Sequence, residues 1–274
     1  MGFERTISPV KILILGARGW LGGLFYDYLL NMGYDVTHRH EDINSIKKLD
    51  PDVDVVVNFA ASANIDWCEK NKNRTFQNNV LGSVNVAKVC KEAKAKYVFI
   101  SSACILKSED ENDIKYENDK THPRCFYTET KLMAEKLITE IDNDALILRL
   151  RLPVSEVSHP RNLLNKLIGY ERLIDCQESM VVVEDMLPRI LELIQEGAIG
   201  IRHLVSEGTI SPAEVGKLIG HDFEVITKDV LDKQMTSEKR ATRTSTIIGT
   251  RHGYLPPIRN RIADVVVKWK ATCN

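Results

Sequence analysis

The sequence predicts an α/β protein with a doubly wound parallel sheet, and three observations support this prediction. Short apolar runs rich in strand-forming residues recur between residues 11 and 150. Stretches with helical spacing separate these runs, as expected for parallel strands joined by crossover helices. A glycine-rich turn follows the first run directly. The chain has 274 residues, 43% hydrophobic and 27% charged, which is the composition of a folded globular protein and allows one large domain or two small ones.

The predicted elements follow one another in a regular order. The first strand is the apolar run 11–15, which ends at Gly16. The first helix carries apolar residues at 21, 24, 25, 28 and 29 and stops near Gly33, a residue suited to a helix C-terminus. Further strands are predicted at 34–36, 53–58, 97–100 and 145–150, and helices at 75–93 and 131–141. Short, largely apolar strands fit a sheet that is covered on both faces.

Charge and composition disfavour several classes of function. Lys plus Arg total 37 and Asp plus Glu total 38, so the net charge is −1, without the basic excess typical of nucleic-acid binding. No apolar run approaches the roughly 20 residues needed to span a bilayer, and residues 1–9 lack the apolar core of a signal peptide. The six cysteines form no CxxC pair, which argues against a zinc site or a disulfide scaffold. We therefore expect no metal and a cytoplasmic protein.

The turn after the first strand has the features of a dinucleotide-binding site. Its residues are Gly16, Arg18, Gly19, Trp20, Leu21 and Gly22, with Ala17 between the first two. Glycines let the backbone approach a pyrophosphate, and the following helix presents free N–H groups and a partial positive charge to it. A tight turn without a ligand is the structural alternative. The strand–turn–helix context favours the cofactor site.

The end of the second strand favours NADPH over NADH. An NAD site has an acidic residue about 20 positions after the first glycine, where it accepts a hydrogen bond from the ribose 2′-hydroxyl. Here the sequence reads Thr37–His38–Arg39–His40, and carboxylates follow only at 41 and 42. Arg39 and Arg18 are therefore predicted to hold a 2′-phosphate through charge-assisted hydrogen bonds. The alternative is that both arginines are simply solvated.

The pattern becomes less regular beyond about Pro153, where a smaller lobe is predicted. We expect residues 8–155, rejoined by about 178–206, to form the Rossmann-like NADP-binding domain. Residues 156–177 and 207–274 are expected to form a substrate-binding lobe. Within it, Ser211 and Pro212 have the pattern of a helix N-cap followed by proline in the first turn.

Tyr127 and Lys131 form a YxxxK motif at the start of a predicted helix. Residues four apart share a helix face, so the two side chains can converge. A nearby ammonium favours the phenolate and lowers the pKa of a tyrosine, which suits proton donation to a carbonyl oxygen as hydride arrives. Ser102 ends the strand at 97–100, on the edge where ligands of open α/β sheets bind, and is predicted to hydrogen-bond that carbonyl. The alternative for Ser102 is a turn serine.

Together these motifs resemble the extended short-chain dehydrogenase/reductases over nearly the whole chain. The resemblance also includes Asn58–Phe59–Ala60–Ala61 and Asn79. More narrowly, the chain is similar to the nucleotide-rhamnose synthases, the bifunctional 3,5-epimerase/4-reductase branch, and matches the monofunctional dTDP-4-dehydrorhamnose reductases less well. The segments that carry this narrower match are Gly19–Gly23, Asn64–Glu69, Asn79–Ser83, Arg149–Ser155, and Pro160–Asn162 with Lys166 and Tyr170.

The resemblance implies roles for residues that are otherwise unremarkable. It implies that Ala60, Ala61 and Asn79 contact the cofactor, and that Arg161, Asn162 and Arg243 contact a nucleotide-sugar substrate carried on UDP or dTDP. It also implies that Cys104 and Lys166 are the base and the acid of epimerisation, because a keto group acidifies the protons on the carbons next to it. The alternatives are a small buried residue for Cys104 and a solvated helix face for Lys166.

Three functions remain open at this point. The first is conversion of a nucleotide 4-keto-6-deoxyglucose to nucleotide-L-rhamnose, by 3,5-epimerisation and C4 reduction. The second is a 4-reductase without epimerase activity, and the third is a non-catalytic regulatory subunit that binds NADPH. Residues 244–249 depart from the asparagine-rich pattern of the family, so a different sugar, such as one with an acetamido group at C2, remains an alternative. A homodimer is compatible with the resemblance.

Overall fold

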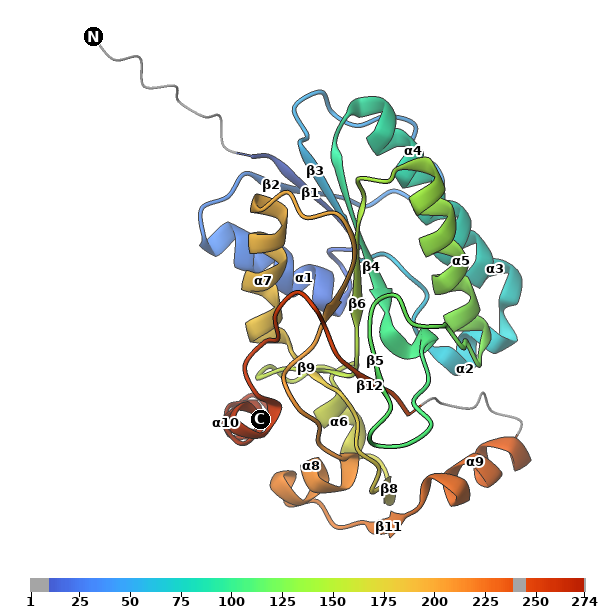
Figure 1. The fold of residues 1–274 in the computed structure, drawn as a ribbon. Coiled ribbons are helices and arrows are strands. Elements are labelled where there is room, and N and C mark those ends of the chain that lie inside the picture. The colour runs from blue at the N-terminus through green and yellow to red at the C-terminus, as the bar shows by residue number, and fades with distance from the viewer. Residues whose placement is uncertain (1–9, 239–244, 274) are drawn as a thin grey trace.

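A six-stranded parallel sheet forms the centre of the molecule (Figure 1). The computed structural model describes residues 10–238 and 245–273. The strand order is β10–β6–β4–β3–β1–β2, and every neighbouring pair is parallel. The strands are β1 (Ile12–Leu15), β2 (Val36–Arg39), β3 (Val55–Asn58), β4 (Lys96–Ser102), β6 (Leu146–Leu150) and β10 (Gly200–Leu204). The predicted fold class, a doubly wound parallel sheet with a smaller C-terminal part, is confirmed.

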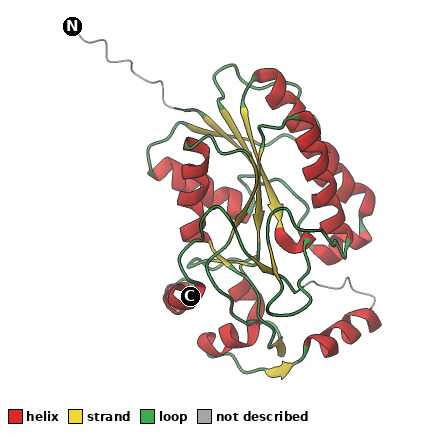
Figure 2. Ribbon diagram, viewed as in Figure 1, coloured by secondary structure: helices red, strands yellow, loops and turns green. Residues whose placement is uncertain are grey.

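Helices cover both faces of this sheet (Figure 2). On one face, α1 (Trp20–Asn31) and α7 (Val183–Gln195) pack against alternate strand residues such as Ile12 and Val57. On the other face, α4 (Ser83–Ala93) and α5 (Phe126–Ile141) pack against residues such as Leu13 and Phe99. The central strands are buried on both sides, which is why their sequences read as continuous apolar runs.

Several predicted elements differ from the structure in their limits; the helix expected at 131–141, for example, begins at Phe126. The second strand was expected at 34–36, but β2 begins at Val36 and includes three polar residues. Its register is set by backbone pairing with β1 (Ile12 with Val36, Leu15 with Arg39), so side-chain polarity does not mark its end. The helix expected at 75–93 begins earlier, as α3 (Lys72–Phe76), and contains a π-helical turn at Gln77–Gly82 before α4. Such turns occur frequently at functional sites.

The C-terminal part of the chain builds a second core beyond the carboxyl ends of the strands. Val154, Leu164, Leu173 and Trp269 are among the residues buried in it. Three two-stranded parallel pairs lie here: β11 with β8, β12 with β5, and β7 with β9. The remaining elements are α2 (Ile65–Lys70), β5 (Ile114–Lys115), β7 (Pro153–Val154), α6 (Leu163–Leu167), β8 (Arg172–Ile174), β9 (Val181–Val182), α8 (Pro212–Ile219), β11 (Glu224–Ile226), α9 (Lys228–Ser237), β12 (Ile247–Ile248) and α10 (Ile258–Ala271).

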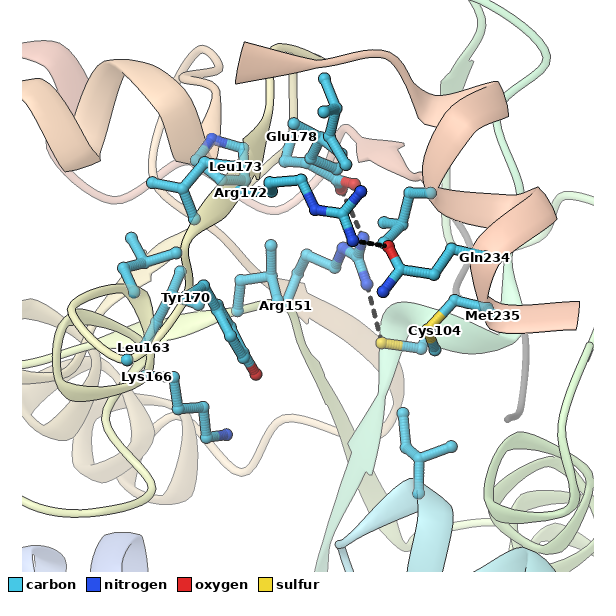
Figure 3. A pocket seen from close by; sticks show the side chains of 18 of the residues that line it. Cys104, Arg151, Leu163, Lys166, Tyr170, Arg172, Leu173, Glu178, Gln234 and Met235 are labelled. Carbon is cyan, nitrogen blue, oxygen red and sulfur yellow. Dashed lines mark hydrogen bonds and ion pairs between the residues drawn. The ribbon is translucent and has the colours of Figure 1, made fainter. Parts of the chain in front are cut away.

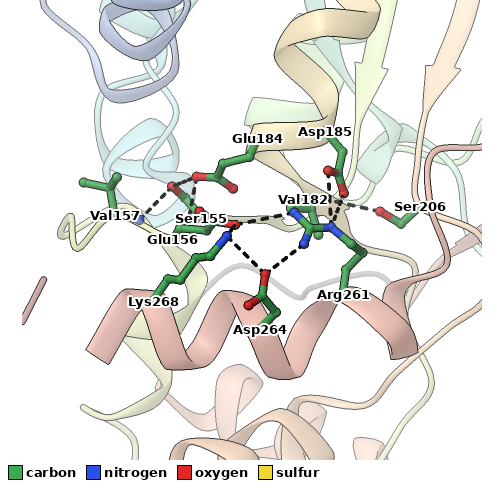
Figure 4. A network of polar contacts seen from close by, with 10 residues as sticks. All are labelled: Ser155, Glu156, Val157, Val182, Glu184, Asp185, Ser206, Arg261, Asp264 and Lys268. Carbon is green, nitrogen blue, oxygen red and sulfur yellow. Dashed lines mark hydrogen bonds and ion pairs between the residues drawn. The ribbon is translucent and has the colours of Figure 1, made fainter. Parts of the chain in front are cut away.

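A network of ion pairs fixes the final helix, α10, to the rest of the molecule (Figure 4). Arg261 pairs with Asp185 at the start of α7 at 2.9 Å and with Glu156 at 3.5 Å. Lys268, two turns further along α10, reaches the same Glu156 at 3.0 Å. These contacts join α10 to segments more than 70 residues earlier in the chain, so the last helix holds the position of the 155–162 loop.

The division into two lobes stays a prediction, although β10 does return to the main sheet beside β6. The helix start predicted at Ser211 is present: its hydroxyl accepts a hydrogen bond from the Glu214 N–H, and Pro212 occupies the first turn of α8. Across residues 10–238 and 245–273, no helix has the length and apolar character required to cross a membrane.

Candidate active site

The glycine turn after β1 has a geometry that requires its glycines. Gly16 has a φ of +84°, and a Cβ atom built there would lie 2.7 Å from the backbone nitrogen of Ala60. A Cβ at Gly22 would lie 2.4 Å from the carbonyl oxygen of Gly16. The Gly19 N–H donates to that same carbonyl at 2.8 Å, which closes the turn. Helix α1, the turn and the loop after β3 therefore pack backbone against backbone.

The turn fits the diphosphate of a dinucleotide. Helix α1 is 12 residues long, and its N-cap residue, Gly19, makes no side-chain capping hydrogen bond. The first turn of the helix contains no acidic residue. Its N–H groups and partial positive charge are therefore not offset by a neighbouring carboxylate, as binding of an anion requires. Trp20, at the start of α1, stacks on His159 of the 155–162 loop with ring centroids 5.5 Å apart.

At the end of β2, the guanidinium of Arg39 is already engaged by neighbouring protein groups. Its guanidinium pairs with Glu41 at 3.1 Å and Asp50 at 3.0 Å, and donates to the Lys48 carbonyl at 2.9 Å. Arg39 thus holds the loop at 41–50. Arg18 in the glycine turn is exposed.

Asn79, predicted from the family resemblance to touch the cofactor, is buried and acts within the protein. Its amide oxygen accepts from the Ser62 N–H at 2.7 Å, and its nitrogen donates to the Ser62 carbonyl at 3.0 Å and to Thr130 at 3.1 Å. Asn79 lies in the π-helical turn and joins the loop after β3 to α5. That loop contains Ala60 and Ala61, which are half-buried beside the glycine turn.

Ser102, Tyr127 and Lys131 come together at the carboxyl edge of the sheet. Ser102 lies close enough to Tyr127 for its side chain to lower the pKa of the phenol. Lys131 is buried, and its ammonium donates to the Ile100 carbonyl at 2.6 Å and lies 4.3 Å from the centre of the Phe99 ring. Burial lowers the pKa of Lys131 to about 8, against the opposing effect of the Glu135 carboxylate.

The pKa of Tyr127 moves in the opposite direction to the one expected from the sequence. Burial, together with the nearby Cys104, raises the pKa of Tyr127, and the hydrogen bond from Ser102 only partly offsets this. The Lys131 ammonium is directed at the Ile100 carbonyl, so its effect on the phenol is weaker than the motif alone suggests. Tyr127 is consequently neutral at physiological pH, which is the state a proton donor needs.

A buried ion pair fixes the strand ends behind these residues. Glu135, one turn after Lys131 on α5, accepts hydrogen bonds from Arg149 at 2.7 Å and from the Ser101 hydroxyl at 2.5 Å. Arg149 also donates to the Glu117 carbonyl at 2.9 Å. Because both charges are buried and paired, the carboxyl ends of β4 and β6 are held at a fixed distance from α5.

A cavity of about 560 Å³ opens beside this group, between the sheet edge and the C-terminal part (Figure 3). Cys104 lines it from the sheet side, and Lys166 and Tyr170 line it from the region of α6. In Figure 3 Cys104 and Lys166 lie on opposite sides of the cavity, with Arg151 between them. The cavity therefore gathers residues predicted separately from the sequence, and its volume suits a small-molecule ligand.

Arg151 is the main residue of the cavity that the sequence analysis left without a role. Its guanidinium lies 2.8 Å from the Cys104 sulfur and forms an ion pair with Glu178. Burial by itself would lower the pKa of Arg151, but Glu178 and Cys104 raise it, so the guanidinium is permanently charged. Leu152, the next residue, has a φ of +37°. A signal was present in the sequence, because Arg149 and Arg151 flank the end of an apolar strand, where buried arginines need charged partners.

Other cavity residues also escaped the sequence analysis. Arg124 and Arg172 bring two further guanidinium groups to the lining, and Arg172 donates to Gln234 of α9 at 2.7 Å. These residues lie in segments that carry no recognisable motif. Three arginines and a lysine around one cavity favour an anionic ligand.

The residues predicted to contact the substrate differ in their burial. Asn162 is fully buried and caps α6; its amide donates to the carbonyls of Ser155 at 2.8 Å and Val157 at 2.9 Å, so it shapes the loop. Arg161 is exposed. Arg243 lies outside the described residues.

The sheet, the glycine turn and the Ser–Tyr–Lys group define a nucleotide-binding protein of the extended short-chain dehydrogenase/reductase class. More specifically, the chain belongs to the RmlD substrate binding domain family, which it matches over residues 10–246. The resemblance inferred from the motifs is thereby confirmed.

Two of the relatives are plant proteins whose names describe nucleotide-sugar enzymes. The bifunctional dTDP-4-dehydrorhamnose 3,5-epimerase/dTDP-4-dehydrorhamnose reductase of Arabidopsis thaliana is 27% identical over 223 residues, covering 76% of this chain and 74% of that protein. A trifunctional UDP-glucose 4,6-dehydratase/3,5-epimerase/reductase of the same plant is 30% identical over 226 residues, or 75% of this chain. The chain spans only 33% of the length of that trifunctional protein.

Solved structures share the fold over almost the full chain. The L780 UDP-rhamnose synthase of Acanthamoeba polyphaga mimivirus superposes with a TM-score of 0.85 at 22% identity, covering 95% of this chain and 99% of the other. The dTDP-4-dehydrorhamnose reductase of Bacillus anthracis, in complex with NADP, superposes with a TM-score of 0.77 at 17% identity, covering 95% and 98%. At these identities the similarity establishes the fold.

Proposed function

We propose that this chain is an NADPH-dependent nucleotide-sugar enzyme that epimerises a UDP- or dTDP-linked 4-keto-6-deoxyglucose at C3 and C5 and then reduces C4, giving a nucleotide-L-rhamnose. The observation that carries the proposal is the shared cavity of Cys104 and Lys166, in which the guanidinium of Arg151 lies 2.8 Å from the Cys104 sulfur. A structural cysteine would need no such cation. The activities named for the bifunctional plant relative agree with this proposal.

The reduction uses the residues at the sheet edge. Bound NADPH supplies a hydride to C4 of the sugar. Tyr127 is neutral and lies near Ser102, so both hydroxyls can donate to the C4 oxygen and Tyr127 transfers its proton there. Lys131, buried one turn further along α5, would hold the ribose of the bound cofactor, and its positive charge would favour the phenolate left behind.

Epimerisation uses the residues across the cavity. The 4-keto group makes the protons on C3 and C5 acidic, because loss of either proton leaves an enolate. Cys104, whose sulfur lies 2.8 Å from the Arg151 guanidinium, acts as the base that removes the proton from one face of the sugar ring. Lys166, on the other side of the cavity, returns a proton to the opposite face and inverts the centre. Arg124 and Arg172 provide charge for the diphosphate of the substrate.

One experiment separates this function from its alternatives. The purified chain is incubated in D2O with NADPH and UDP- or dTDP-4-keto-6-deoxyglucose, and the product sugar is identified by NMR. Rhamnose carrying deuterium at C3 and C5 is the expected result. Reduction without deuterium incorporation would leave a 4-reductase and return Cys104 and Lys166 to structural roles. NADPH binding without turnover of either sugar would favour a regulatory subunit.

Substitution of Arg151 tests its role within the same assay. Replacing Arg151 with Met removes the charge beside Cys104, and exchange at C3 and C5 should fall to the level of Cys104→Ala. Because Arg151→Met also leaves Glu178 buried without its partner, the double variant Arg151→Met/Glu178→Gln serves as the folded control. Unchanged exchange in the folded double variant would remove Arg151 from the proposal.

A further inference from the structure

Two hydrogen bonds join α5 to β4 in opposite directions. The Lys131 ammonium of α5 donates to the Ile100 carbonyl at 2.6 Å, and the hydroxyl of the next strand residue, Ser101, donates to the Glu135 carboxylate of α5 at 2.5 Å. Lys131 and Glu135 are four residues apart and therefore share a face of the helix. The side chains of Lys131, Ser101 and Glu135 are all buried. The carboxyl end of β4 is thus joined to α5 by a cation and an anion one turn apart.

Arg149 of β6 holds the Glu135 carboxylate in place. Its Nε and Nη2 atoms donate to the two carboxylate oxygens at 3.0 and 2.7 Å. Arg149 is in register with Ser101, so two neighbouring strands and the helix meet at one carboxylate. A buried ion pair contributes little net stability, because the desolvation of both charges offsets most of their attraction. An apolar pair could fill the same space, but only a carboxylate can act on the charge of a neighbouring group.

The neighbouring group whose charge burial opposes is Lys131. Burial lowers the pKa of Lys131 to about 8, and the Glu135 carboxylate acts against this effect. Among the described residues, the ammonium has one hydrogen-bond acceptor, the Ile100 carbonyl, and lies 4.3 Å from the centre of the Phe99 ring. A carbonyl dipole and a ring face stabilise a cation less than a full negative charge does. Because the pKa of Lys131 is so close to neutral pH, loss of the nearby carboxylate would leave much of this residue uncharged.

We propose that Glu135 is a positioning residue for the reduction: anchored by Arg149 and Ser101, its carboxylate keeps Lys131 protonated in its buried position. The assignment rests on the proposed reduction of C4, in which the Lys131 ammonium would hold the ribose of the bound cofactor and favour the phenolate of Tyr127. Glu135 is 2% exposed and lies outside the lining of the cavity, so it acts through Lys131.

The other ionisable groups packed in this region do not obscure this effect. They are Tyr127 on α5, Cys104 after β4 and Arg149 on β6, whereas the π-helical turn beside α5 contributes the uncharged Asn79. Burial raises the pKa of Tyr127, so the phenol stays neutral around pH 8, and an arginine guanidinium keeps its charge at any such pH. Tyr127 and Cys104 are left intact in the variants that test the proposal. A change in the titration of Lys131 therefore reports the loss of the carboxylate.

Titration of Lys131 by NMR tests the proposal without substrate or turnover. The full chain is labelled with ¹³C at the lysine ε carbons, and the resonance that is absent from Lys131→Met identifies Lys131. In the wild-type chain this lysine should titrate near pH 8, well below an ordinary lysine. The variant Glu135→Gln/Arg149→Met removes both members of the ion pair and so leaves neither charge buried alone. In it, Lys131 should titrate about one pH unit lower, because an opposite charge nearby is gone.

Two variants that keep the carboxylate serve as matched controls. Glu135→Asp retains the charge, and Ser101→Ala retains the charge but loses one hydrogen bond to it. In both variants Lys131 should titrate close to its wild-type pH, and thermal unfolding checks that each variant is folded. An unchanged titration of Lys131 in the folded double variant would overturn the proposal. A shift of equal size in Ser101→Ala would do the same, because it would trace the effect to the hydrogen bond and not to the charge.

Steady-state reduction assays connect this charge to the chemistry. The alkaline fall of kcat/KM in the double variant should move to lower pH by as much as the titration of Lys131 does. The variant should then be about tenfold slower than the wild-type chain at pH 9 and close to it at pH 6. A loss by the same factor at both pH values would show a purely structural role for Glu135 and overturn the proposal. A shifted titration without turnover of either nucleotide sugar would overturn the proposed function and leave the effect of Glu135 on Lys131 in place.

Discussion

The cofactor turn and the substrate-side cavity of this protein are assembled in opposite ways. The turn lies within residues 16–22, and its glycines are required by backbone contacts that the local geometry creates. The cavity takes its lining from residues spread between Ile65 and Met235, on loops, helices and short strands. The glycine turn can therefore be recognised from one short stretch of sequence. The cavity forms only when segments that are distant along the chain come together. The Trp20–His159 stack joins the start of α1 to the 155–162 loop.

The largest effect is expected at Tyr127, the residue proposed to donate the proton during reduction. Tyr127→Phe removes the proton donor for C4, and reduction should fall by about 10²–10⁴-fold. Deuterium exchange at C3 and C5 should persist, because that step is assigned to Cys104 and Lys166, which line the cavity. NMR in D2O measures both steps in one sample.

Cys104→Ala is the matched variant for that experiment. It should abolish exchange while leaving NADPH binding intact, because Cys104 lies outside the glycine turn. Loss of both exchange and reduction in Tyr127→Phe, with the fold intact, would contradict separate roles for the two residues. An unimpaired rate of exchange in Cys104→Ala would remove the thiol from the mechanism.

The next largest effect is expected in the glycine turn. Gly22→Ala places a Cβ atom 2.4 Å from the Gly16 carbonyl oxygen, so α1 must shift away from the turn. Overpacking of this kind costs about 1–3 kcal/mol. If this cost falls on the NADPH-bound state, NADPH affinity should fall by roughly 5- to 150-fold. Fluorescence titration with NADPH measures it.

Gly23→Ala is the control for this prediction. Its Cβ atom would lie 3.0 Å from the Ala17 carbonyl oxygen, a contact that a small shift relieves. Its NADPH affinity should stay close to that of the wild-type chain. Equal losses in the two variants would show that general helix distortion, and not the Gly16–Gly22 approach, explains the result.

A smaller and gradual effect is expected from pH. Burial lowers the pKa of Lys131 to about 8, so its amine is protonated below that pH and neutral above it. If the charged form supports reduction, kcat/KM should fall on the alkaline side, by up to about tenfold per pH unit above 8. Steady-state reduction assays between pH 6.5 and 10 measure the profile. A profile that stays flat from 7 to 9.5 would separate Lys131 from the reduction step.

The smallest effect is expected in the C-terminal part, at the N-cap of α8. Ser211 accepts from the Glu214 N–H and donates to Asp175 at 2.7 Å, so Ser211→Ala loses a helix cap and a buried hydrogen bond. The expected cost is about 1 kcal/mol, or about 2–4 °C in Tm by calorimetry. Ser211→Thr keeps the oxygen and should lose less. A change in NADPH affinity in Ser211→Ala would show that the two regions are coupled more tightly than their contacts suggest.

The sequence determined the features that depend on neighbours along the chain. The alternation of strands and helices, the glycine turn at 16–22 and the cap at Ser211 all follow from local backbone geometry and periodicity. The YxxxK spacing places Tyr127 and Lys131 on one helix, although the direction of the Tyr127 pKa change depends on burial, which spacing does not reveal.

Only the tertiary structure decided which charges meet. Arg39 and His40 are adjacent in the sequence, yet one pairs with Glu41 and Asp50 and the other lies beside Arg18 and His38. Arg151 reaches Cys104, 47 residues earlier, and Glu178, 27 residues later. Electrostatic and hydrogen-bond energies depend on distance in space and on burial, and neither is set by separation along the chain. The glycine turn is therefore encoded locally, whereas the charged cavity exists only in the folded protein.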